Sequence, residues 1–545
     1  MKKKRMYSIL AALIVIVMSL NGCSPDSKET GDSRFVQKTD GEASGQEQTV
    51  QEQATPGETL PGGETTALTE ESVKAPKYIF LFIGDGMSYP QIQLAADYRG
   101  AMQDKDYMQA LPSRKDNEGS VLDGPEPLGF MDFQAAGSTV NYNTNSFIPD
   151  SASAGTAIAS GHKTYAGHLN TDEQSKVEYE TIAEKVRKQK GMKVGIISTV
   201  NLNHATPAAF YAHQSSRTNY YQIGMDLIAS GFDYFAGGNF LQPRGGKKNK
   251  KSLYKQAKQA GYAVARTQEE AADVRALPAI ITVGSSDDGD DSMMSYELDR
   301  DKKEWSLADY LKKGTELLDN EKGFFIMCEG GKIDLACHAN DAASALHDTL
   351  AFADAVSVAV EFAQKHKEET LIVVTGDHET GGLTIGAAET KYDTYLSLLD
   401  KQKISFEAYD SEYVSTYKKE KTDFGKVLKH IEKLFGLKTS GKKSDRMVLD
   451  EEELERLKTA YQISVLKKNS GMSKKESYKA YGKYEPLTVT ITHIMGEKAG
   501  ISFTTYSHTA LTVGVFADGV NAEVFNGYYD NTEIYKKFAA MLEIE

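Results

Sequence analysis

The chain of 545 residues is long enough to bury a large core and to form more than one structural unit. Its formal net charge of -14 and its isoelectric point near 5.4 argue against nucleic acid as the main partner, because no basic face is implied. We expect the one dense basic run, at 244–251, to be a solvated loop. There are only three cysteines, so the protein does not depend on disulfides for its stability. A disulfide between Cys328 and Cys337 is possible but poorly supported.

A targeting signal opens the chain. A basic run at 2–5 precedes an apolar stretch at 7–20, which is too short for a comfortable membrane span and ends in Leu20-Asn21-Gly22-Cys23. A small residue followed at once by cysteine resembles the bacterial lipoprotein signal, in which residues 1–22 are removed and Cys23 is lipidated. Asn21 is unusual in that signal, so a plain N-terminal membrane anchor is the alternative. Both readings predict an extracytoplasmic body anchored to a bacterial membrane.

Residues 23–74 form the next segment, which is rich in Glu, Gln, Thr, Ser and Gly. Such a composition cannot bury enough apolar surface to offset the loss of chain entropy on folding. We therefore expect a disordered tether that separates the folded body, 75–545, from the bilayer.

Apolar runs alternate with helical patterns through the body. The first run, at 77–83, reads as a buried central strand and is followed by Asp85, and similar runs occur at 193–200, 323–328, 371–375 and 511–516. Helical patterns occupy 178–190 and 342–367. This alternation predicts an α/β fold, a three-layer sandwich around a central, mostly parallel sheet. In such sheets ligands bind beyond the carboxyl ends of the strands, where several of these runs meet an acid.

The segment at about 390–485 differs in composition from the rest of the body and is rich in Lys, Glu, Ser and Tyr. Apolar residues at helical spacing, closed by Gly436 and preceded by the acidic start at 450–453, predict an inserted, mainly helical subdomain with solvated charged faces. The acidic loop at 285–291 suggests calcium binding, but it lacks the EF-hand spacing, so a solvated loop is favoured.

Metal-ligating residue types gather at the expected strand ends. Asp334 and His338 are four positions apart and share one face if a helix begins there, and Asp377-His378 directly follows a buried strand. Imidazole with carboxylate suits zinc, whereas an all-oxygen site such as Glu329 with a hydroxyl suits magnesium. Asp150-Ser151 lies at a predicted helix start, whose free N–H groups suit an anionic substrate. Each feature alone is commonly a cap or a loop hydrogen bonder; their coincidence favours a catalytic site.

Taken in order, these motifs give the chain a definite resemblance to the bacterial alkaline phosphatases, over nearly the whole body. The motifs that carry the resemblance are Gly84-Asp85-Gly86-Met87, the run from Asp150 to Ala157, Gly161-His162-Lys163-Thr164, the run from His204 to Ala209, Arg217, Glu329-Gly330-Gly331, Asp334, His338, Asp377-His378-Glu379-Thr380 and Ser507-His508-Thr509.

The resemblance implies a site with two Zn²⁺ and one Mg²⁺. By motif, Asp334, His338 and His508 would bind the first zinc; Asp85, Asp377 and His378 would bind the second; and Asp85, Thr206 and Glu329 would hold the magnesium. Ser151 would be the nucleophile, with Ser153 as its nearby rival. Arg217 would clamp phosphate, and Asp150 would orient it.

The implied activity is hydrolysis of small phosphate monoesters at alkaline pH through a phosphoserine intermediate, and a homodimer is compatible with it. His204 and Leu335 depart from residues found in some family members, which leaves the metal preference open. Two alternatives remain. One is a phosphodiesterase of the same superfamily, and the other is a lipoprotein that binds phosphate or metal without turnover.

Overall fold

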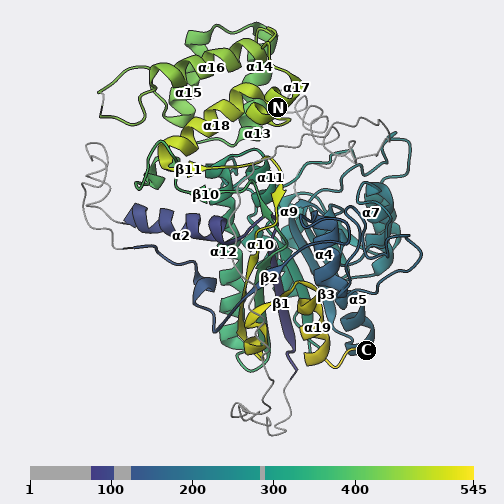
Figure 1. Ribbon diagram of the computed structural model, residues 1–545. Helices are drawn as coiled ribbons and strands as arrows, with labels where there is room; N and C mark the ends of the chain where they lie inside the picture. The colour runs from purple at the N-terminus through teal and green to yellow at the C-terminus, as the bar shows by residue number, and fades with distance from the viewer. Residues whose placement is uncertain (1–74, 104–123, 283–288, 443) are drawn as a thin grey trace, which may run out of the picture.

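The computed structural model describes residues 75–103, 124–282, 289–442 and 444–545 (Figure 1). The predicted signal peptide, Cys23, the predicted tether and most of the acidic loop at 285–291 therefore lie outside the described residues. Among the helices that are described, none has both the length and the apolarity needed to cross a membrane.

A ten-stranded sheet runs through the middle of the molecule. Neighbouring strands pair in parallel except around β13, which is antiparallel to both β8 and β2. In spatial order the strands are β14 (Gly527–Asp530), β2 (Ala135–Val140), β13 (Val513–Gly519), β8 (Thr370–Gly376), β1 (Tyr78–Gly84), β7 (Phe324–Glu329), β3 (Lys193–Asn201), β4 (Tyr234–Gly238), β6 (Ala279–Thr282) and β5 (Ala263–Ala265).

Strand β1 is central because both of its faces are apolar. Phe80 and Phe82 point into one hydrophobic cluster, whereas Ile79, Leu81 and Ile83 point into a second cluster on the opposite face. Helices cover both faces, so the expected three-layer α/β sandwich is confirmed (Figure 1). The helices packed in the first cluster are α2 (Tyr89–Gln103), α9 (Gln268–Asp273), α10 (Leu307–Leu318), α11 (Lys332–His338) and α12 (Ala342–Lys365). Those packed in the second are α4 (Ser151–Ser160), α5 (Ile182–Lys185), α6 (Ala205–Ala208), α7 (Tyr220–Ser230), α8 (Leu253–Gln259) and α19 (Thr532–Met541).

Two expectations need correction. The strand expected at 511–516 begins at Val513 and runs against its neighbours, so its carboxyl end lies at the edge of the sheet opposite to the ends of β1 and β8. The helix expected from 178 starts only at Ile182, because the Thr181 side chain caps it there, and it finishes in a π-helical turn (Val186–Lys190). Cys328 and Cys337 are free buried thiols, so the poorly supported disulfide between them does not form.

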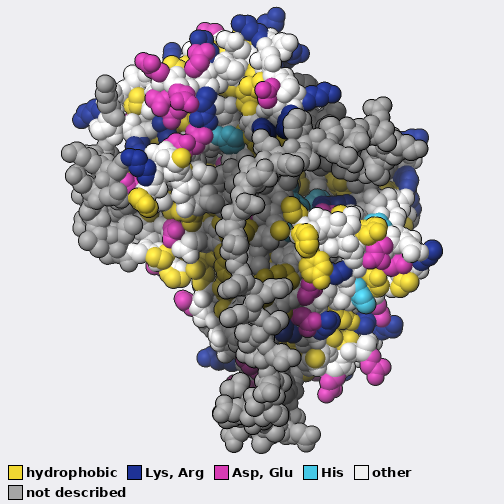
Figure 2. Space-filling view, viewed as in Figure 1, with side chains coloured by type: hydrophobic (Ala, Val, Ile, Leu, Met, Phe, Trp, Pro, Cys, Tyr) yellow, Lys and Arg dark blue, Asp and Glu magenta, His cyan; other side chains and the backbone are white. Residues whose placement is uncertain are grey.

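The helical region lies at one end of the molecule (top of Figure 1) and has a hydrophobic cluster of its own. It comprises α13 (Phe406–Tyr409), α14 (Ser415–Glu420), α15 (Phe424–Phe435), α16 (Glu451–Ser464), α17 (Lys474–Tyr481) and α18 (Pro486–Ala499). Asp423 caps the start of α15, and Gly436 ends it in the left-handed conformation, as the sequence pattern suggests. The cluster continues past 485 because Leu487 and Ile491 of α18 are fully buried in it. Acidic and basic side chains intermingle over its surface (Figure 2).

Candidate metal centre and nucleophile

Four adjacent strands, β8, β1, β7 and β3, deliver polar side chains to one edge of the sheet. Asp377 follows β8, Asp85 follows β1, and Glu329 is the last residue of β7. All three side chains are buried. Because carboxyl ends of parallel strands meet at the same edge, residues far apart in the sequence become neighbours here.

The N-terminus of α4 faces this edge. Asp150 is the N-cap, accepting hydrogen bonds from the Ser153 backbone N–H at 3.2 Å and the Ser153 hydroxyl at 2.7 Å. The Ser153 hydroxyl is thus engaged in capping. Ser151 is the first helical residue, and its Oγ lies 3.2 Å from Nε2 of His378. Of the two serines, Ser151 is the one in contact with the histidine and carboxylate cluster.

Arg217 is held beside this helix start by Asp150, whose Oδ2 accepts from Nη1 at 2.9 Å. Burial alone would raise the pKa of Asp150, but the Arg217 charge and the Ser153 hydrogen bond outweigh it and hold that pKa at about 2. The other arm of the fork, Nη2, lies 3.4 Å from Nε2 of His204. Burial, reinforced by the Arg217 charge, lowers the pKa of His204 to about 3, so this imidazole is neutral.

One cluster joins Asp334 with His338 and His508. Both Nε2 atoms approach Asp334 Oδ1, at 3.4 and 3.6 Å, and lie 3.1 Å from each other. Backbone carbonyls fix the other ring nitrogens: His338 Nδ1 is 2.7 Å from the Tyr506 oxygen, and His508 Nδ1 is 2.8 Å from the Pro149 oxygen. Both imidazoles therefore direct Nε2 at the same carboxylate, an arrangement that suits a shared cation.

A second cluster joins Asp85, Asp377 and His378. His378 Nε2 lies 3.4 Å from Asp85 Oδ1 and 3.3 Å from Asp377 Oδ2. The backbone N–H groups of Gly86 and His378 donate to Asp377 Oδ1, leaving the other oxygen directed at the cluster. The His378 ring stacks on His508 with centroids 3.7 Å apart, so the two clusters adjoin.

Glu329 and Thr206 complete an oxygen-rich corner. The Thr206 hydroxyl donates to Asp85 Oδ2 at 3.2 Å, and Glu329 Oε2 accepts from the Ser198 hydroxyl. At this site three buried carboxylate oxygens accept no hydrogen bond from any described residue: Asp85 Oδ1, Asp377 Oδ2 and Glu329 Oε1. Buried acceptors without partners are costly unless a cation satisfies them. The donor set therefore fits divalent cations.

The electrostatics of these residues also favour cations. Burial, reinforced by neighbouring carboxylates, raises the pKa of Asp85 well above its usual range and that of Asp377 to about 7. Burial likewise raises the pKa of Glu329 to about 8. It lowers the pKa of His378 to about 4, so that the imidazole is neutral and its ring nitrogen is free to act as a ligand. These acids cannot all be ionised at neutral pH unless positive charge is supplied.

All ten residues predicted for the site come together at this edge of the sheet. Two contributors were missed. Thr380, whose hydroxyl donates to Asp334 Oδ1 at 2.6 Å, lies in a motif that carried the resemblance, but its contact has no sequence signal. Ser198, which donates to Glu329, lies near the carboxyl end of β3 beside Thr199, and nothing in the sequence distinguishes the two. Leu335 packs partly buried against the apolar core.

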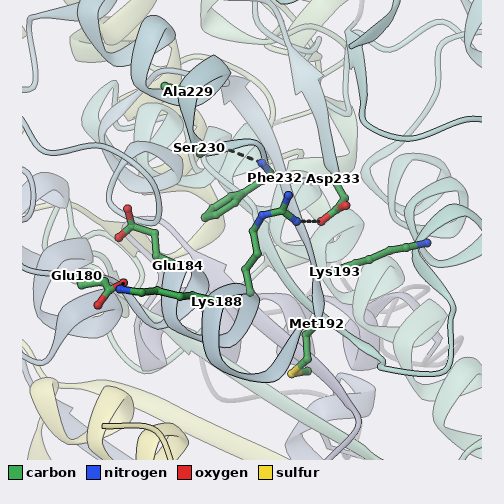
Figure 3. A pocket seen from close by; sticks show the side chains of 11 residues that line it. Glu180, Glu184, Lys188, Met192, Lys193, Ala229, Ser230, Phe232 and Asp233 are labelled. Atoms are coloured by element: carbon green, nitrogen blue, oxygen red, sulfur yellow. Dashed lines mark hydrogen bonds and ion pairs between the residues drawn. The ribbon is translucent and has the colours of Figure 1, made fainter. Parts of the chain in front are cut away.

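A pocket of about 650 Å³ lies away from this site (Figure 3). It includes Lys193, the first residue of β3, and so opens at the opposite edge of the sheet. Its charged side chains neutralise one another: Arg187 pairs with Asp233 at 2.9 Å, and Lys188 with Glu180 at 3.0 Å. The unpartnered carboxylate oxygens and the two histidine clusters make the metal-ligand edge the better candidate for a catalytic site.

Comparisons with known proteins point to one family. A family model described as alkaline phosphatase matches residues 76–544. Alkaline phosphatase 4 of Bacillus subtilis (strain 168) is 31% identical over 467 residues, covering 84% of this chain and 86% of that protein. The cold-active alkaline phosphatase of the psychrophile Shewanella sp. has a TM-score of 0.66 at 26% identity, covering 85% of this chain and 99% of that one. The Thermus thermophilus alkaline phosphatase shares the fold, with a TM-score of 0.68 at 23% identity and coverage of 90% and 96%.

Proposed function

Because the chain belongs to the alkaline phosphatase family and is an enzyme of that class, we propose that it hydrolyses phosphate monoesters through a phosphoserine on Ser151. One observation carries this proposal. The Ser151 hydroxyl, 3.2 Å from His378, lies where a helix start, an arginine and two carboxylate–histidine clusters meet. A binding protein for phosphate or metal would need no hydroxyl at that point.

We propose two Zn²⁺ and one Mg²⁺ as the cofactors. Asp334, His338 and His508 would hold one zinc, Asp85, Asp377 and His378 the other, and Asp85, Thr206 and Glu329 the magnesium. Imidazole–carboxylate sets suit zinc, and the all-oxygen corner suits magnesium. When bound, the ions supply positive charge that stabilises developing oxyanions. The unpartnered oxygens of the acids support this assignment.

The chain's own residues perform the remaining tasks. The Arg217 fork holds two phosphoryl oxygens, and Asp150 keeps it facing the helix start. Ser151 attacks phosphorus as the ester oxygen departs, which releases the alcohol and leaves a phosphoserine. Water then breaks the serine–phosphorus bond and releases phosphate. The free N–H groups at the start of α4 favour the anion throughout. Rising pH increases the supply of alkoxide and hydroxide, which would explain an alkaline optimum.

The test compares 4-nitrophenyl phosphate with bis(4-nitrophenyl) phosphate, after chelation and again after adding zinc and magnesium. We expect the monoester to be preferred and its turnover to disappear and return with the metals. Ser151→Ala should abolish turnover, whereas Ser160→Ala, a matched change at the far end of α4, should leave it intact. Preference for the diester would replace this function with phosphodiesterase activity. Wild-type turnover in Ser151→Ala would remove the serine from the mechanism.

We also propose that the enzyme works outside the cytoplasm, anchored through a lipid on Cys23 and spaced from the membrane by residues 23–74. The support is the sequence pattern alone: a basic start, an apolar stretch and a small residue before the cysteine. Cys23→Ser should release the enzyme from membrane fractions if lipidation anchors it; unchanged sedimentation would favour an uncleaved apolar anchor. A homodimer is part of the same proposal, and light scattering would test it.

A further inference from the structure

The hydroxyl of Ser153, the second serine at the start of α4, is fully engaged in hydrogen bonds. Asn143 Nδ2 donates to its Oγ at 3.2 Å, and the Asp150 backbone N–H donates to the same oxygen at 3.3 Å. A serine hydroxyl has two acceptor lone pairs and one proton to donate. Because both lone pairs are taken, the proton goes to Asp150, whose Oδ1 accepts at 2.7 Å; the Asp150 main-chain oxygen is farther, at 3.1 Å.

Asn143 sets the direction of this hydrogen-bond chain. Its Oδ1 accepts from the Asn145 backbone N–H at 3.1 Å, so the amide presents its Nδ2 donor to Ser153. Both side chains of the Asn143–Ser153 pair are buried, so little water competes for the hydrogen bond between them. Asn145 also joins this loop to the next one, because its Oδ1 accepts from the Ala166 N–H at 3.1 Å, one residue before Gly167.

Gly167 fixes the same carboxylate from a second loop. Its N–H donates to Asp150 Oδ1 at 3.0 Å, and its carbonyl accepts from the Arg217 backbone N–H at 2.7 Å. Asp150 Oδ1 therefore receives three donors: the Gly167 N–H, the Ser153 N–H and the Ser153 hydroxyl. Oδ2 remains for the Arg217 guanidinium, at 2.9 Å. The carboxylate cannot turn without breaking several of these bonds.

We propose that Asn143 and Ser153 are positioning residues for phosphate capture. A guanidinium holds two phosphoryl oxygens in a fork only when its plane is aligned with them. The Asp150 carboxylate sets that plane for Arg217, and the Asn143–Ser153 pair keeps the carboxylate from rotating. Neither side chain needs to touch phosphate, because both act through Arg217. This inference rests on the proposed role of Arg217 in the monoesterase reaction.

The experiment is a double-mutant cycle with Arg217→Ala, measured with 4-nitrophenyl phosphate on the metal-loaded enzyme. Ser153→Ala and Asn143→Ala should each lower kcat/KM about 3- to 10-fold, the value of one hydrogen bond, mainly through KM. In the Arg217→Ala background both changes should have no further effect, because the group through which they act is gone. Ser160→Ala is the matched control: Ser160 is also buried in α4, but its hydroxyl donates to the Thr156 carbonyl, and kcat/KM should not change.

Binding of inorganic phosphate provides a readout independent of turnover. Calorimetry on the metal-loaded proteins should show Ser153→Ala and Asn143→Ala binding phosphate about 3- to 10-fold more weakly than the wild type, with Ser160→Ala unchanged. If phosphate binding weakens in this way but no monoester is cleaved, the proposed function fails and the positioning role stands. The positioning role is overturned if both variants bind phosphate as tightly as the wild type, or if they lose the same fraction of activity with and without Arg217.

Discussion

Replacing Asp150 separates the contribution of its charge from its role as a helix cap. The carboxylate caps α4 through Ser153, accepts from the Gly167 N–H at 3.0 Å, and pairs with Arg217 at 2.9 Å. Asparagine is as good a cap as aspartate, whereas alanine is not. Asp150→Asn therefore removes mainly the charge, and Asp150→Ala removes the cap as well.

The magnitude follows from the pKa. A shift from 3.8 to about 2 corresponds to about 2.5 kcal/mol of folding free energy at neutral pH. Because the folded pKa is depressed, this stability is present above pH 4 and is lost as the pH falls toward 2. Asp150→Asn should lose most of it, and Asp150→Ala about 1 kcal/mol more for the missing cap. In both variants Arg217 loses the charged partner that holds its guanidinium toward the helix start, so we expect kcat/KM to fall about 10- to 100-fold.

Urea unfolding of the metal-loaded proteins at several pH values measures the first effect, and monoester hydrolysis measures the second. Asp423→Asn is the matched control, because Asp423 caps α15 without an arginine partner, and we expect it to change neither quantity appreciably. The difference in the free energy of unfolding between the wild type and Asp150→Asn should become smaller as the pH falls from 5 toward 3. Full stability and full activity in Asp150→Asn at pH 7 would refute the reasoning.

Three further outcomes are expected. The buried Lys332 ammonium lies 3.0 Å from the Glu407 carboxylate, and Glu407→Gln removes that charged partner. Urea unfolding should show that Glu407→Gln lowers the free energy of unfolding by about 2 kcal/mol, more than Lys332→Met does. Gly86→Ala, at a φ of +71° with its Cβ 2.8 Å from the Asp334 backbone, should weaken zinc retention during dialysis; unchanged metal content would contradict this. Metal-free protein should lose melting temperature as pH rises from 5 to 8, because acids with raised pKa, such as Glu329, ionise without compensation.

The sequence predicts best what depends on local pattern. The apolar run of β1, followed by Asp85, predicts a strand buried on both faces, and the spacing of Asp334 and His338 predicts that they share one helix face. The meeting of Asp85 with Asp377 follows once the sheet is parallel, because the carboxyl ends of neighbouring parallel strands lie at the same edge.

What the sequence could not predict depends on contacts between distant segments. The reversal of β13 is a choice of pairing partners, which its apolar residues do not encode. It also explains His508, which approaches the site from the beginning of a strand instead of its end. Helix α18 belongs to the helical region because Leu487 is buried in that region's core. The change in amino-acid composition near 485 had placed the boundary before this helix. The role of Ser198 as a hydrogen-bond donor at the site follows only from the pairing of β3 with β7, which places Ser198 beside Glu329.

A short antiparallel ladder joins β9 (Glu379–Thr380) to β12 (His508–Thr509). His508 pairs with Thr380 and Thr509 with Glu379, so the chain leaves the metal centre after His378 and returns to it at His508 through one clasp. Everything between forms a closed loop with its own core for most of its length, and the entropy of closing a loop depends only weakly on its length. Because both ends of this loop are fixed beside the metal ligands, a change in the length of the helical region should cost little closure entropy and leave the positions of His378 and His508 unaltered.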